Sequence, residues 1–465
     1  MKTIEILSLV GVLALLAEIF RFKKLLLPIV LVGLLGAAGA AVYDWNTNIH
    51  YYYSMLTFDN YALLFSIVLC GTVFLWFLST QDYFSEDGHL TDKTSLAIFS
   101  LIGAVIIVSY SNMVMLFLGI EILSIPLYVL AGSRKDNLFS NEASLKYFLM
   151  GAFASGILLF GIALVYGATG TFDLSKLATY LSSPAPLASV RGDGGTVLLS
   201  AGILMMLVGI SFKVAAAPFH FWTPDVYEGA PTPVTGFMAS IVKTAAFAAF
   251  LRLFMNCFIG YGTFWSNIIW VLSVLSILLG NITAVYQTSV KRMLAYSSIA
   301  HAGYMLLAIL TSGSMSAGAI LFYSAAYSVA TIGAFTVIAI IEKTYNTVTI
   351  DSFSGLAKKN PLLAFAMTLF MLSLAGIPPL AGFFGKYYLF TSSLQAGYIW
   401  IVLVAVLGSL VGVYYYFRVI IAMYAKGKET VEEIQVTSLQ KIVLLLTILL
   451  SLALGVLPEF IIRLI

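Results

Sequence analysis

The sequence predicts an all-α polytopic membrane protein with about fourteen transmembrane helices, inverted five-helix repeats and two discontinuous helices, the seventh and the twelfth. Only 10% of the 465 residues are charged and 61% are hydrophobic. A soluble domain carries about 25% charged residues. Long apolar runs recur along the chain, and prolines interrupt two of them. So few charges cannot coat a body of this length in water, and the hydrocarbon of a bilayer is the alternative solvent.

The apolar runs have the length of membrane spans, because a spanning helix needs roughly 20 mostly apolar residues. The first run carries Glu5 and Glu18 and leads directly to Arg21. It is therefore expected to be a first membrane helix rather than a cleavable signal peptide. The expected spans are residues 3–20, 25–43, 60–80, 94–110, 112–131, 142–168, 196–223, 231–255, 264–287, 293–312, 315–342, 361–395, 396–424 and 439–463.

Prolines break the seventh and twelfth spans. "FKVAAAPFHFWTP" contains Pro218, and "AGIPPLAGFFGK" contains Pro378 and Pro379, each of which interrupts the helical hydrogen-bond ladder. The breaks are five spans apart, an odd number, so the second unit is inverted; paired broken helices indicate inverted repeats in transporters. When the two repeats are compared, His301 in the tenth span occupies the position that Glu121 occupies in the fifth span. The expected organisation is 1–93 for the first three spans, 94–260 and 261–426 for the two repeats, and 427–465 for a cytoplasmic loop and the last span.

The distribution of cations predicts the orientation, because loops rich in Lys and Arg face the cytoplasm. Fifteen of the 24 Lys and Arg residues lie in one set of alternate loops, against four in the opposite loops and termini. We therefore expect a bacterial inner (plasma) membrane protein with both termini in the periplasm. The fifteen are Arg21, Lys23, Lys24, Lys93, Arg134, Lys135, Lys291, Arg292, Lys343, Lys358, Lys359, Arg418, Lys426, Lys428 and Lys441, and the four are Lys2, Lys176, Arg191 and Arg463.

Several ionisable residues fall inside or beside the predicted spans. An ionised group at the bilayer centre costs at least about 2.5–3.5 kcal/mol on insertion scales, which makes such a residue a functional hypothesis by default. Apart from Arg252, near the outer end of the eighth span, the cations left within the spans are all lysines. Lysine can lose a proton when desolvated, whereas arginine cannot. This choice predicts a proton pathway. The candidates are Glu121, Lys146, Lys213, His220, Lys243, His301 and Lys386.

Most of these candidates also have a structural explanation. Lys146 lies about one turn into its span, so its side chain could extend to the cytoplasm. Lys213 and Lys386 could satisfy backbone groups freed at the helix breaks. Glu121 could act only as the counter-ion of a lysine, and a lone histidine among apolar neighbours is often hydrogen-bonded packing. Lys243, about twelve residues from either end of its helix, is the hardest to explain in this way.

No motif for a cofactor is present in the sequence. Cys70 and Cys257 form no CxxC or metal-ligand spacing. There is no Walker loop and no GxGxxG after a strand. We therefore expect no cofactor or metal in this chain, and the net charge of +3 is too small to indicate nucleic acid. Asp225 and Glu228, in the loop after the seventh span, are expected to cap the next helix or to face water.

Five segments resemble the antiporter-like membrane subunits of respiratory complex I, a family shared with the Mrp-type cation/proton antiporters. They are "GIEILSIPLYVLAG", "EASLKYFLMG", "FKVAAAPFHFWTPDVYEGAPTPV", "KRMLAYSSIAHAGY" and "AGIPPLAGFFGKYYLF". The resemblance covers nearly the whole chain and is strongest to the N-type subunits. No lateral helix of the L-type follows the last span, the twelfth span has a lysine where the M-type has a glutamate, and "EASLKYF" is similar to the N-type sixth span.

The resemblance implies a role for each candidate residue of the first repeat. Glu121 would pair with Lys213 and set its pKa, and Lys146 would lie between the Glu121 region and Lys213. His220 and Lys243 would relay protons along a central polar axis.

For the second repeat, the resemblance implies that Lys386 connects to the periplasmic half-channel, with His301 on the same axis. It also implies that electron transfer from NADH to quinone in other subunits drives the proton movement. The implied partners are other antiporter-like and small membrane-arm subunits, and lipids. An Mrp-type cation/proton antiporter subunit and an inactive membrane scaffold are the alternative functions.

Overall fold

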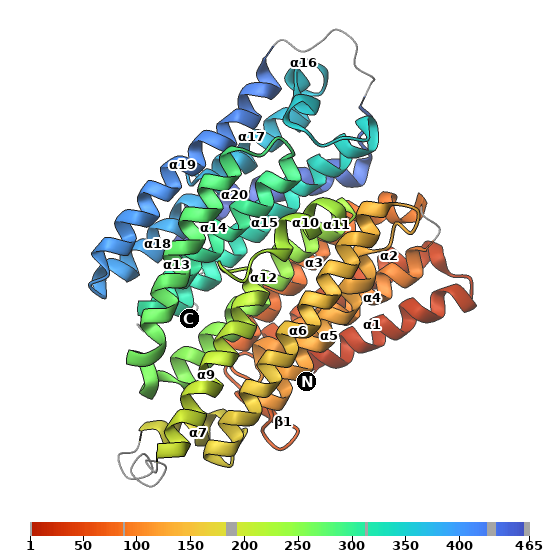
Figure 1. Cartoon of the computed structure of the whole chain (residues 1–465). Helices are drawn as coiled ribbons and strands as arrows, with labels where there is room; N and C mark the ends of the chain where they lie inside the picture. Colours follow the sequence, from red (N-terminus) through yellow and green to blue (C-terminus); the bar gives the residue numbers. More distant parts are fainter. Residues whose placement is uncertain (1, 87–88, 183–192, 312–314, 426–433, 460–465) are drawn as a thin grey trace.

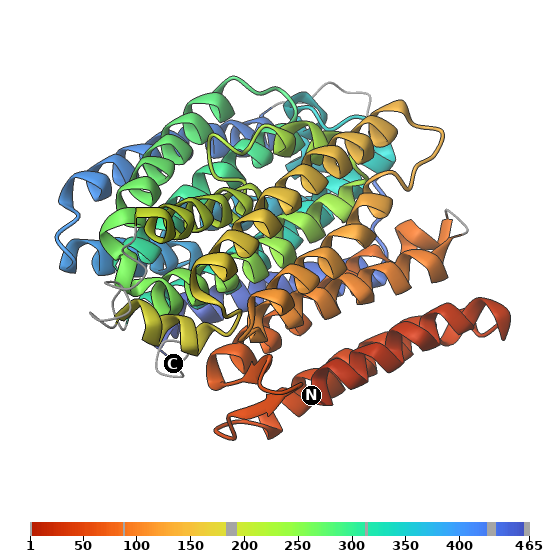
Figure 2. The ribbon, with the colours of Figure 1, turned by 60° about the horizontal axis from the view of Figure 1, so that its bottom comes forward.

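Long helices packed side by side make up almost the whole molecule (Figure 1). The structure is a computed structural model, and it describes residues 2–86, 89–182, 193–311, 315–425 and 434–459. The red N-terminal helices and the blue helix α19 lie at opposite edges of the bundle (Figure 1). Turning the molecule shows α1 along the outside of the remaining helices (Figure 2). Arg191, Lys426, Lys428 and Arg463, which entered the prediction of orientation, lie outside the described residues.

The elements follow one another along the chain as α-helices, two short strands, and short π- and 3-10 helices marked η. They are α1 (Lys2–Ile19), α2 (Lys23–Tyr43), β1 (Ile49–Tyr51), β2 (Leu56–Phe58), α3 (Asn60–Glu86), α4 (Leu90–Ser109), α5 (Met113–Ala131), α6 (Leu138–Thr169), α7 (Leu174–Ser182), α9 (Asp193–Val214), α10 (Trp222–Gly229), α11 (Thr232–Phe237), η1 (Met238–Val242), α12 (Lys243–Leu251), η2 (Arg252–Cys257), η3 (Ile259–Tyr261), α13 (Gly262–Val285), α14 (Val290–Thr311), α15 (Met315–Tyr345), η4 (Ile350–Phe353), α16 (Leu356–Lys359), α17 (Pro361–Ala375), α18 (Ala381–Gln395), α19 (Ile399–Tyr424) and α20 (Ser438–Val456).

The helices confirm the predicted multi-span architecture. Among the described residues, 12 helices are long and apolar enough to cross a membrane, with α11, η1, α12 and η2 forming one continuous span. The two other expected spans are α1, which has 18 residues, and the broken pair α17 and α18, which have 15 residues each. Neither member of that pair reaches the length of a span alone. The small hairpin of β1 and β2, and helix α7, were not predicted; both lie at the same end of the bundle (Figure 1).

Both broken spans end their first half in the same way. After α9, Ala215 is left-handed with a φ of 61°, and the Ala216 N–H donates to the Ser211 carbonyl over 2.9 Å. After α17, Gly376 is left-handed with a φ of 85°, and the Ile377 N–H donates to Leu372 over 3.0 Å. These are the bonds of a Schellman cap, which ends a helix. A proline follows within three residues in each case and cannot continue the helix.

Helix α10 corrects one expectation about the first break. Asp225 and Glu228 were expected in a loop, as caps of the next helix or as solvated side chains. They lie in α10, the short helix that follows the break, and not in a loop, while both side chains remain partly exposed. The next helix, α11, has Pro231 at its N-cap and no side-chain cap. Both carboxylates have cationic partners, which are described with the site below.

Two helix pairs pack with the same register, which supports the inverted repeat. A Cβ atom on Gly103 of α4 would lie 2.3 Å from the Leu123 nitrogen of α5. A Cβ atom on Gly280 of α13 would lie 2.5 Å from the Ala300 nitrogen of α14. The same number of residues separates the two glycines as separates the two contacted residues. Only glycine permits these approaches, because the contacted atoms belong to backbone.

This register corrects the predicted equivalence of Glu121 and His301. With Gly103 and Gly280 superposed, Glu121 corresponds to Ser298, and His301 corresponds to Ser124. The sequence comparison placed the two residues at equivalent positions because it had no contact to fix the alignment within one helical turn.

Three spans are surrounded by protein rather than by the membrane. The span Thr232–Cys257 is 100% buried over its most apolar window, and α14 and α15 are each 94% buried. The corresponding value for α2 at the edge is 28%. Polar side chains on the three central spans therefore face other protein groups, which is where ionisable residues at membrane depth are tolerated.

We predict that Gly103→Ala lowers stability by about 1–3 kcal/mol, because the new methyl group meets the backbone of α5, which cannot rotate away. Thermal unfolding in mild detergent measures the change. Gly156→Ala on α6 is the matched control, since a Cβ atom there has no neighbour within 4 Å. If Gly103→Ala is as stable as Gly156→Ala, the proposed close approach of α4 and α5 is wrong.

Candidate functional site

Lys243 lies in the most buried span, and its side chain is bound only by neutral groups. It follows the π-helical turn η1, and wide turns of this kind often occur at functional sites. Lys243 is 3% exposed, and its Nζ donates to both the carbonyl and the hydroxyl oxygen of Ser298. The Tyr327 ring centroid lies 5.7 Å from Nζ. Among the described residues no carboxylate forms an ion pair with it.

Lys213, at the end of α9, is bound by hydroxyl groups of α5. Its Nζ lies 2.8 Å from the Ser124 hydroxyl and 3.4 Å from that of Tyr128. Glu121 lies on α5 about one turn from Ser124, and its Oε1 atom is buried without a hydrogen-bond partner in the described chain. The two charges are close enough to interact electrostatically but form no direct ion pair within 4.0 Å. The direct pairing implied by the resemblance is therefore absent in this conformation.

Lys386, at the second break, is bound to the break itself. Nζ donates to the Ala375 carbonyl over 2.8 Å and to the Ser409 hydroxyl over 2.8 Å. Ala375 is the last residue of α17, so the lysine satisfies a carbonyl that the break leaves free. The structural explanation considered for this residue thus applies. Gly376 itself has a φ of 85°, a left-handed conformation that favours glycine.

The first break does not use Lys213 in this way. The Phe212 carbonyl accepts from the Trp222 indole N–H over 3.1 Å, and the Ala217 N–H donates to the Ser276 hydroxyl over 2.8 Å. These two backbone groups are therefore satisfied by residues other than Lys213. Lys213 is available for another role.

His301 lies between Lys243 and Lys386. Its Nδ1 contacts the Tyr323 hydroxyl, and its Nε2 lies 3.0 Å from the Tyr416 hydroxyl. His301 is one helical turn from Ser298, the partner of Lys243, on α14. His301, Tyr323 and Lys386 also line one cavity of about 10 Å³, at the lower limit for a single water molecule. The structure thus brings the three candidates Lys243, His301 and Lys386 together along one face of α14.

His220 does not join this axis. It lies in the linker between α9 and α10, and its ring stacks on Phe221 with centroids 4.8 Å apart. Its Nδ1 is buried without a hydrogen-bond partner in the described chain. No contact links it to Lys243, the partner that the resemblance implied for it.

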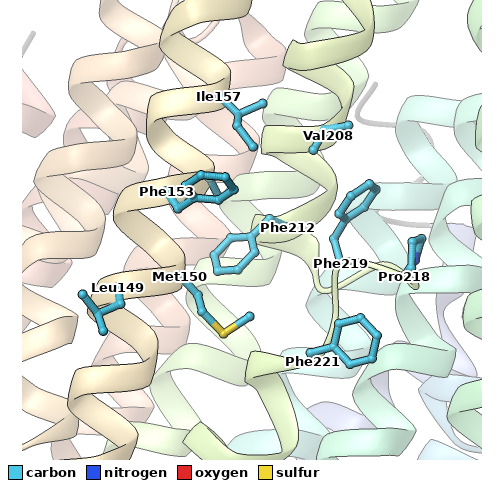
Figure 3. Close-up of a pocket in the computed structure, with 10 residues that line it drawn as sticks. Leu149, Met150, Phe153, Ile157, Val208, Phe212, Pro218, Phe219 and Phe221 are labelled. Atoms are coloured by element: carbon cyan, nitrogen blue, oxygen red, sulfur yellow. The ribbon is translucent and has the colours of Figure 1, made fainter.

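The same linker forms an apolar groove on the outside of the bundle. The groove has a volume of about 440 Å³ and lies between α6 and α9. Figure 3 shows Phe153, Phe212, Phe219 and Phe221 around it, and Phe221 is 68% exposed. Its lining contains no titratable side chain, so it is not part of the candidate proton pathway.

Lys146 lies in a charged cavity and not between Glu121 and Lys213, where the resemblance would place it. Its Nζ forms ion pairs of 2.7 Å with Glu142 and 2.7 Å with Asp225, and its side chain is 39% exposed. Two helical turns from the start of α6, the side chain extends to the end of the bundle, as the alternative explanation expected.

The cavity around Lys146, of about 480 Å³, opens at the end of the bundle that carries Arg134 and Arg292; we call this the basic end. Arg292 forms ion pairs with Asp225 over 3.0 Å and with Glu228 over 2.9 Å. Partial burial raises the pKa of the Asp225 carboxyl, but its bonds to Lys146 and Arg292 outweigh this and hold that pKa below its usual range. The two carboxylates of α10 are therefore partners of cations rather than helix caps.

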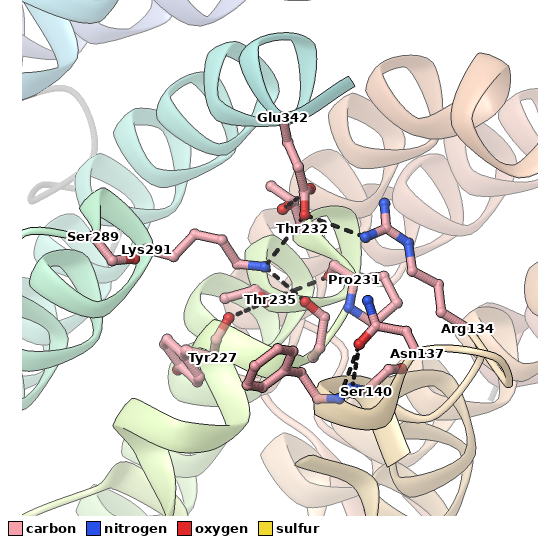
Figure 4. Close-up of polar contacts among 12 residues, drawn as sticks. Arg134, Asn137, Ser140, Tyr227, Pro231, Thr232, Thr235, Ser289, Lys291 and Glu342 are labelled. Atoms are coloured by element: carbon pink, nitrogen blue, oxygen red, sulfur yellow. Dashed lines mark hydrogen bonds and ion pairs between the residues drawn. The ribbon is translucent and has the colours of Figure 1, made fainter. Parts of the chain in front are cut away.

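Sequence analysis missed Lys291 and Glu342. Lys291 was counted among the loop cations, but it lies in the first turn of α14 and is only 2% exposed. Its Nζ donates to the Ala230 carbonyl over 2.8 Å and lies 4.0 Å from the Glu342 carboxylate (Figure 4). A sequence signal existed: Lys291 is seven residues before Ser298, so both face the same side of α14. No pattern in the sequence pointed to Glu342 at the end of α15.

Comparisons with known proteins agree with this architecture. The family model described as "NADH:quinone oxidoreductase/Mrp antiporter, TM" matches residues 111–412. A protein of Cytophaga hutchinsonii named NADH-quinone oxidoreductase subunit N is 47% identical over 92% of this chain and 91% of its own length. The subunit of that name in Flavobacterium johnsoniae is 42% identical over 100% of both chains.

Solved structures show the same fold. A chain of respiratory complex I from Thermus thermophilus with bound aureothin matches with a TM-score of 0.83 and 34% identity, over 99% of this chain and 98% of its own. A chain of the Mrp complex from Dietzia sp. has a TM-score of 0.86 but 21% identity, over 99% of this chain and 95% of its own, and shows the fold alone. The family match and the identity to named relatives lead to one conclusion: the chain belongs to the NADH:quinone oxidoreductase/Mrp antiporter membrane family, among the subunit N proteins of NADH-quinone oxidoreductase.

Proposed function

We propose that this chain translocates protons as a membrane-arm subunit of an NADH:quinone oxidoreductase, driven by electron transfer from NADH to quinone in other subunits. One observation carries the proposal. Lys213, Lys243 and Lys386 are buried at membrane depth without a direct carboxylate partner in the described chain, and each is held by hydroxyl or carbonyl oxygens. A desolvated lysine can exist with or without its proton, which a proton carrier requires.

In the proposed cycle, Glu121 controls the proton on Lys213. When the carboxylate approaches, it favours the ammonium form; when it withdraws, that form loses its counter-charge and the proton moves to Lys243. The conformation described here corresponds to the withdrawn arrangement, because no direct ion pair joins the two. His301, with its two tyrosine partners, then relays the proton from Lys243 to Lys386.

The other two candidates have different places in the proposal. Lys146, at the charged cavity, takes up protons from the basic end and passes them towards Lys213. His220 is a candidate relay only by its position in the first break, since no contact ties it to the axis.

The chain is a multi-pass membrane protein. The proposal further places it in the bacterial inner membrane with the basic end towards the cytoplasm and both termini in the periplasm. The excess of fifteen cations over four in alternate loops supports this orientation. Protons are then taken up at the basic end and released beyond Lys386.

The partners are other subunits of complex I. In particular, we propose contacts with antiporter-like and small membrane-arm subunits and with lipids. NADH and quinone bind to other subunits, and this chain binds no cofactor and no nucleic acid. An Mrp-type cation/proton antiporter subunit is the second candidate, because the fold is shared.

Copurification separates the two candidates. We expect the chain, extracted in mild detergent from its native membrane, to copurify with subunits that contain flavin and iron–sulfur clusters. Absorption spectra and protein mass spectrometry identify these partners. If the chain is isolated only with cation-antiporter subunits and without any redox centre, the proposed function is wrong and the second candidate is favoured.

We predict that Lys213→Met and Lys243→Met each slow proton transfer through this chain by roughly 100-fold or more, the usual contribution of a positioned acid or base. NADH-driven pumping into closed membrane vesicles, per assembled complex, measures the effect. Lys441→Met, which removes an exposed lysine at the start of α20, is the control. Glu121→Gln should also lose pumping. Wild-type pumping in the Lys213 and Glu121 variants contradicts the proposed cycle.

A further inference from the structure

Glu342 connects four segments at the basic end of the bundle. Its carboxylate accepts from Arg134 over 3.2 Å and from the hydroxyl of Thr232, and it lies 4.0 Å from the Nζ of Lys291 (Figure 4). These partners come from the loop between α5 and α6, from the start of α11 and from the start of α14. Glu342 also lines the charged cavity, so it is both open to water on one side and bound to buried groups on the other.

Lys291 lies on the inner side of this carboxylate. It is 2% exposed and donates one hydrogen bond, to the Ala230 carbonyl. The separation of 4.0 Å from Glu342 is an ion pair but is too long for a hydrogen bond. An ammonium has three donors, so Lys291 retains capacity to transfer a proton further.

Two helices lead from this pair to Lys243. On α14, Lys291 and Ser298 are two turns apart on one face, a rise of about 10 Å, and Ser298 is the partner of Lys243. On the span Thr232–Cys257, Thr232 and Lys243 lie on the two sides of the π-helical turn η1. Lys291 is therefore the next cation on the way from the cavity to Lys243.

The space between these groups contains further polar atoms. Tyr227 of α10 is buried, and its hydroxyl interacts with Ser298. The Thr235 hydroxyl donates to the Tyr227 carbonyl over 2.9 Å. Figure 4 draws Tyr227 and Thr235 in the same cluster of polar residues as Lys291. A tyrosine hydroxyl can both accept and donate a proton, so it suits a relay position between Lys291 and Ser298.

We propose that Lys291 and Glu342 form a gate through which protons pass from the charged cavity to Lys243. The inference rests on the proposed function and adds a direct access route to Lys243 beside the transfer from Lys213. Glu342 takes a proton from water in the cavity, the Lys291 ammonium passes its own proton inward through the Tyr227 hydroxyl to neutral Lys243, and Glu342 then reprotonates Lys291. Each step moves one proton and consumes nothing else.

A purely structural clamp is the competing explanation, because Glu342 also holds the α10–α11 link against α14 and α15. The two differ in what they require of the side chain. A clamp requires hydrogen-bond partners of the right length, which glutamine supplies. A gate requires a group that binds and releases a proton, which glutamine lacks and aspartate supplies.

The test compares Glu342→Gln and Glu342→Asp in the full complex. We expect Glu342→Gln to lose most of the NADH-driven proton pumping per assembled complex and Glu342→Asp to recover most of it. Native gels give the amount assembled. Asp59→Asn is the matched control, because it removes a carboxylate from an ion pair with Arg252 at the opposite end of the bundle. Its pumping should equal that of the wild type.

Two results would overturn the gate: wild-type pumping by Glu342→Gln, or equal losses in Glu342→Gln and Glu342→Asp. If Glu342→Gln does not assemble, the double variant Lys291→Met with Glu342→Gln replaces it, since it leaves no unpaired buried charge. Wild-type pumping by the double variant overturns the gate in the same way. Lys243→Met keeps the two proposals distinct: if it loses pumping while the Glu342 variants do not, only the gate is wrong.

Discussion

An ionised amine away from water must be held by the protein around it, and the arrangement of this bundle depends on that requirement. At the bilayer centre the cost is several kcal/mol unless protein or enclosed water supplies partners. The three most buried spans lie in the middle, where Lys243 and His301 meet hydroxyl groups and a backbone carbonyl. Helix α2, which has no such residue near its centre, lies at the edge.

The partners of the buried lysines differ from those of the cations at the ends of the bundle. Lys213 and Lys243 are held by hydroxyl and carbonyl oxygens. Lys146 and Arg292 at the basic end, and Arg252 at the other, are held by carboxylates. A carboxylate in contact favours the charged form strongly, whereas a neutral oxygen permits either form. Cations paired with carboxylates thus lie at the ends of the bundle, and lysines held by neutral oxygens lie in its centre.

The two breaks show that the repeat is symmetric in backbone and asymmetric in side chains. Both first halves end in a Schellman cap followed by proline. In the second break Lys386 bonds to the carbonyl of the last residue of α17, while in the first break Trp222 bonds to the Phe212 carbonyl in the last turn of α9 and Lys213 turns to α5. Lys386 therefore combines a structural bond with its place in the pathway. Lys213 is held across helices and depends on how α5 and α9 pack.

The sequence predicted where a residue lies along its span, but it did not predict which residues of other helices contact it. The prolines located both breaks, and the residue order placed Lys243 near the middle of its span. Asp225 and Glu228 were placed in a loop because prolines surround them. They lie in helix α10 instead, where Asp225 forms an ion pair with Lys146 and Glu228 forms one with Arg292. His301 was aligned one turn away from its true counterpart because periodicity does not fix register between helices.

By itself, the sequence determined that this chain crosses a membrane many times, that two spans are broken and that lysines lie at membrane depth. Hydrophobic length, proline chemistry and the cost of buried charge act locally along the chain, so they can be read from it. Only the tertiary structure decided that Glu121 and Lys213 are apart, that Lys146 reaches the surface and that Lys291 is buried beside Glu342. Each of these depends on the rotation and depth of one helix against another, which packing between residues far apart in the sequence sets.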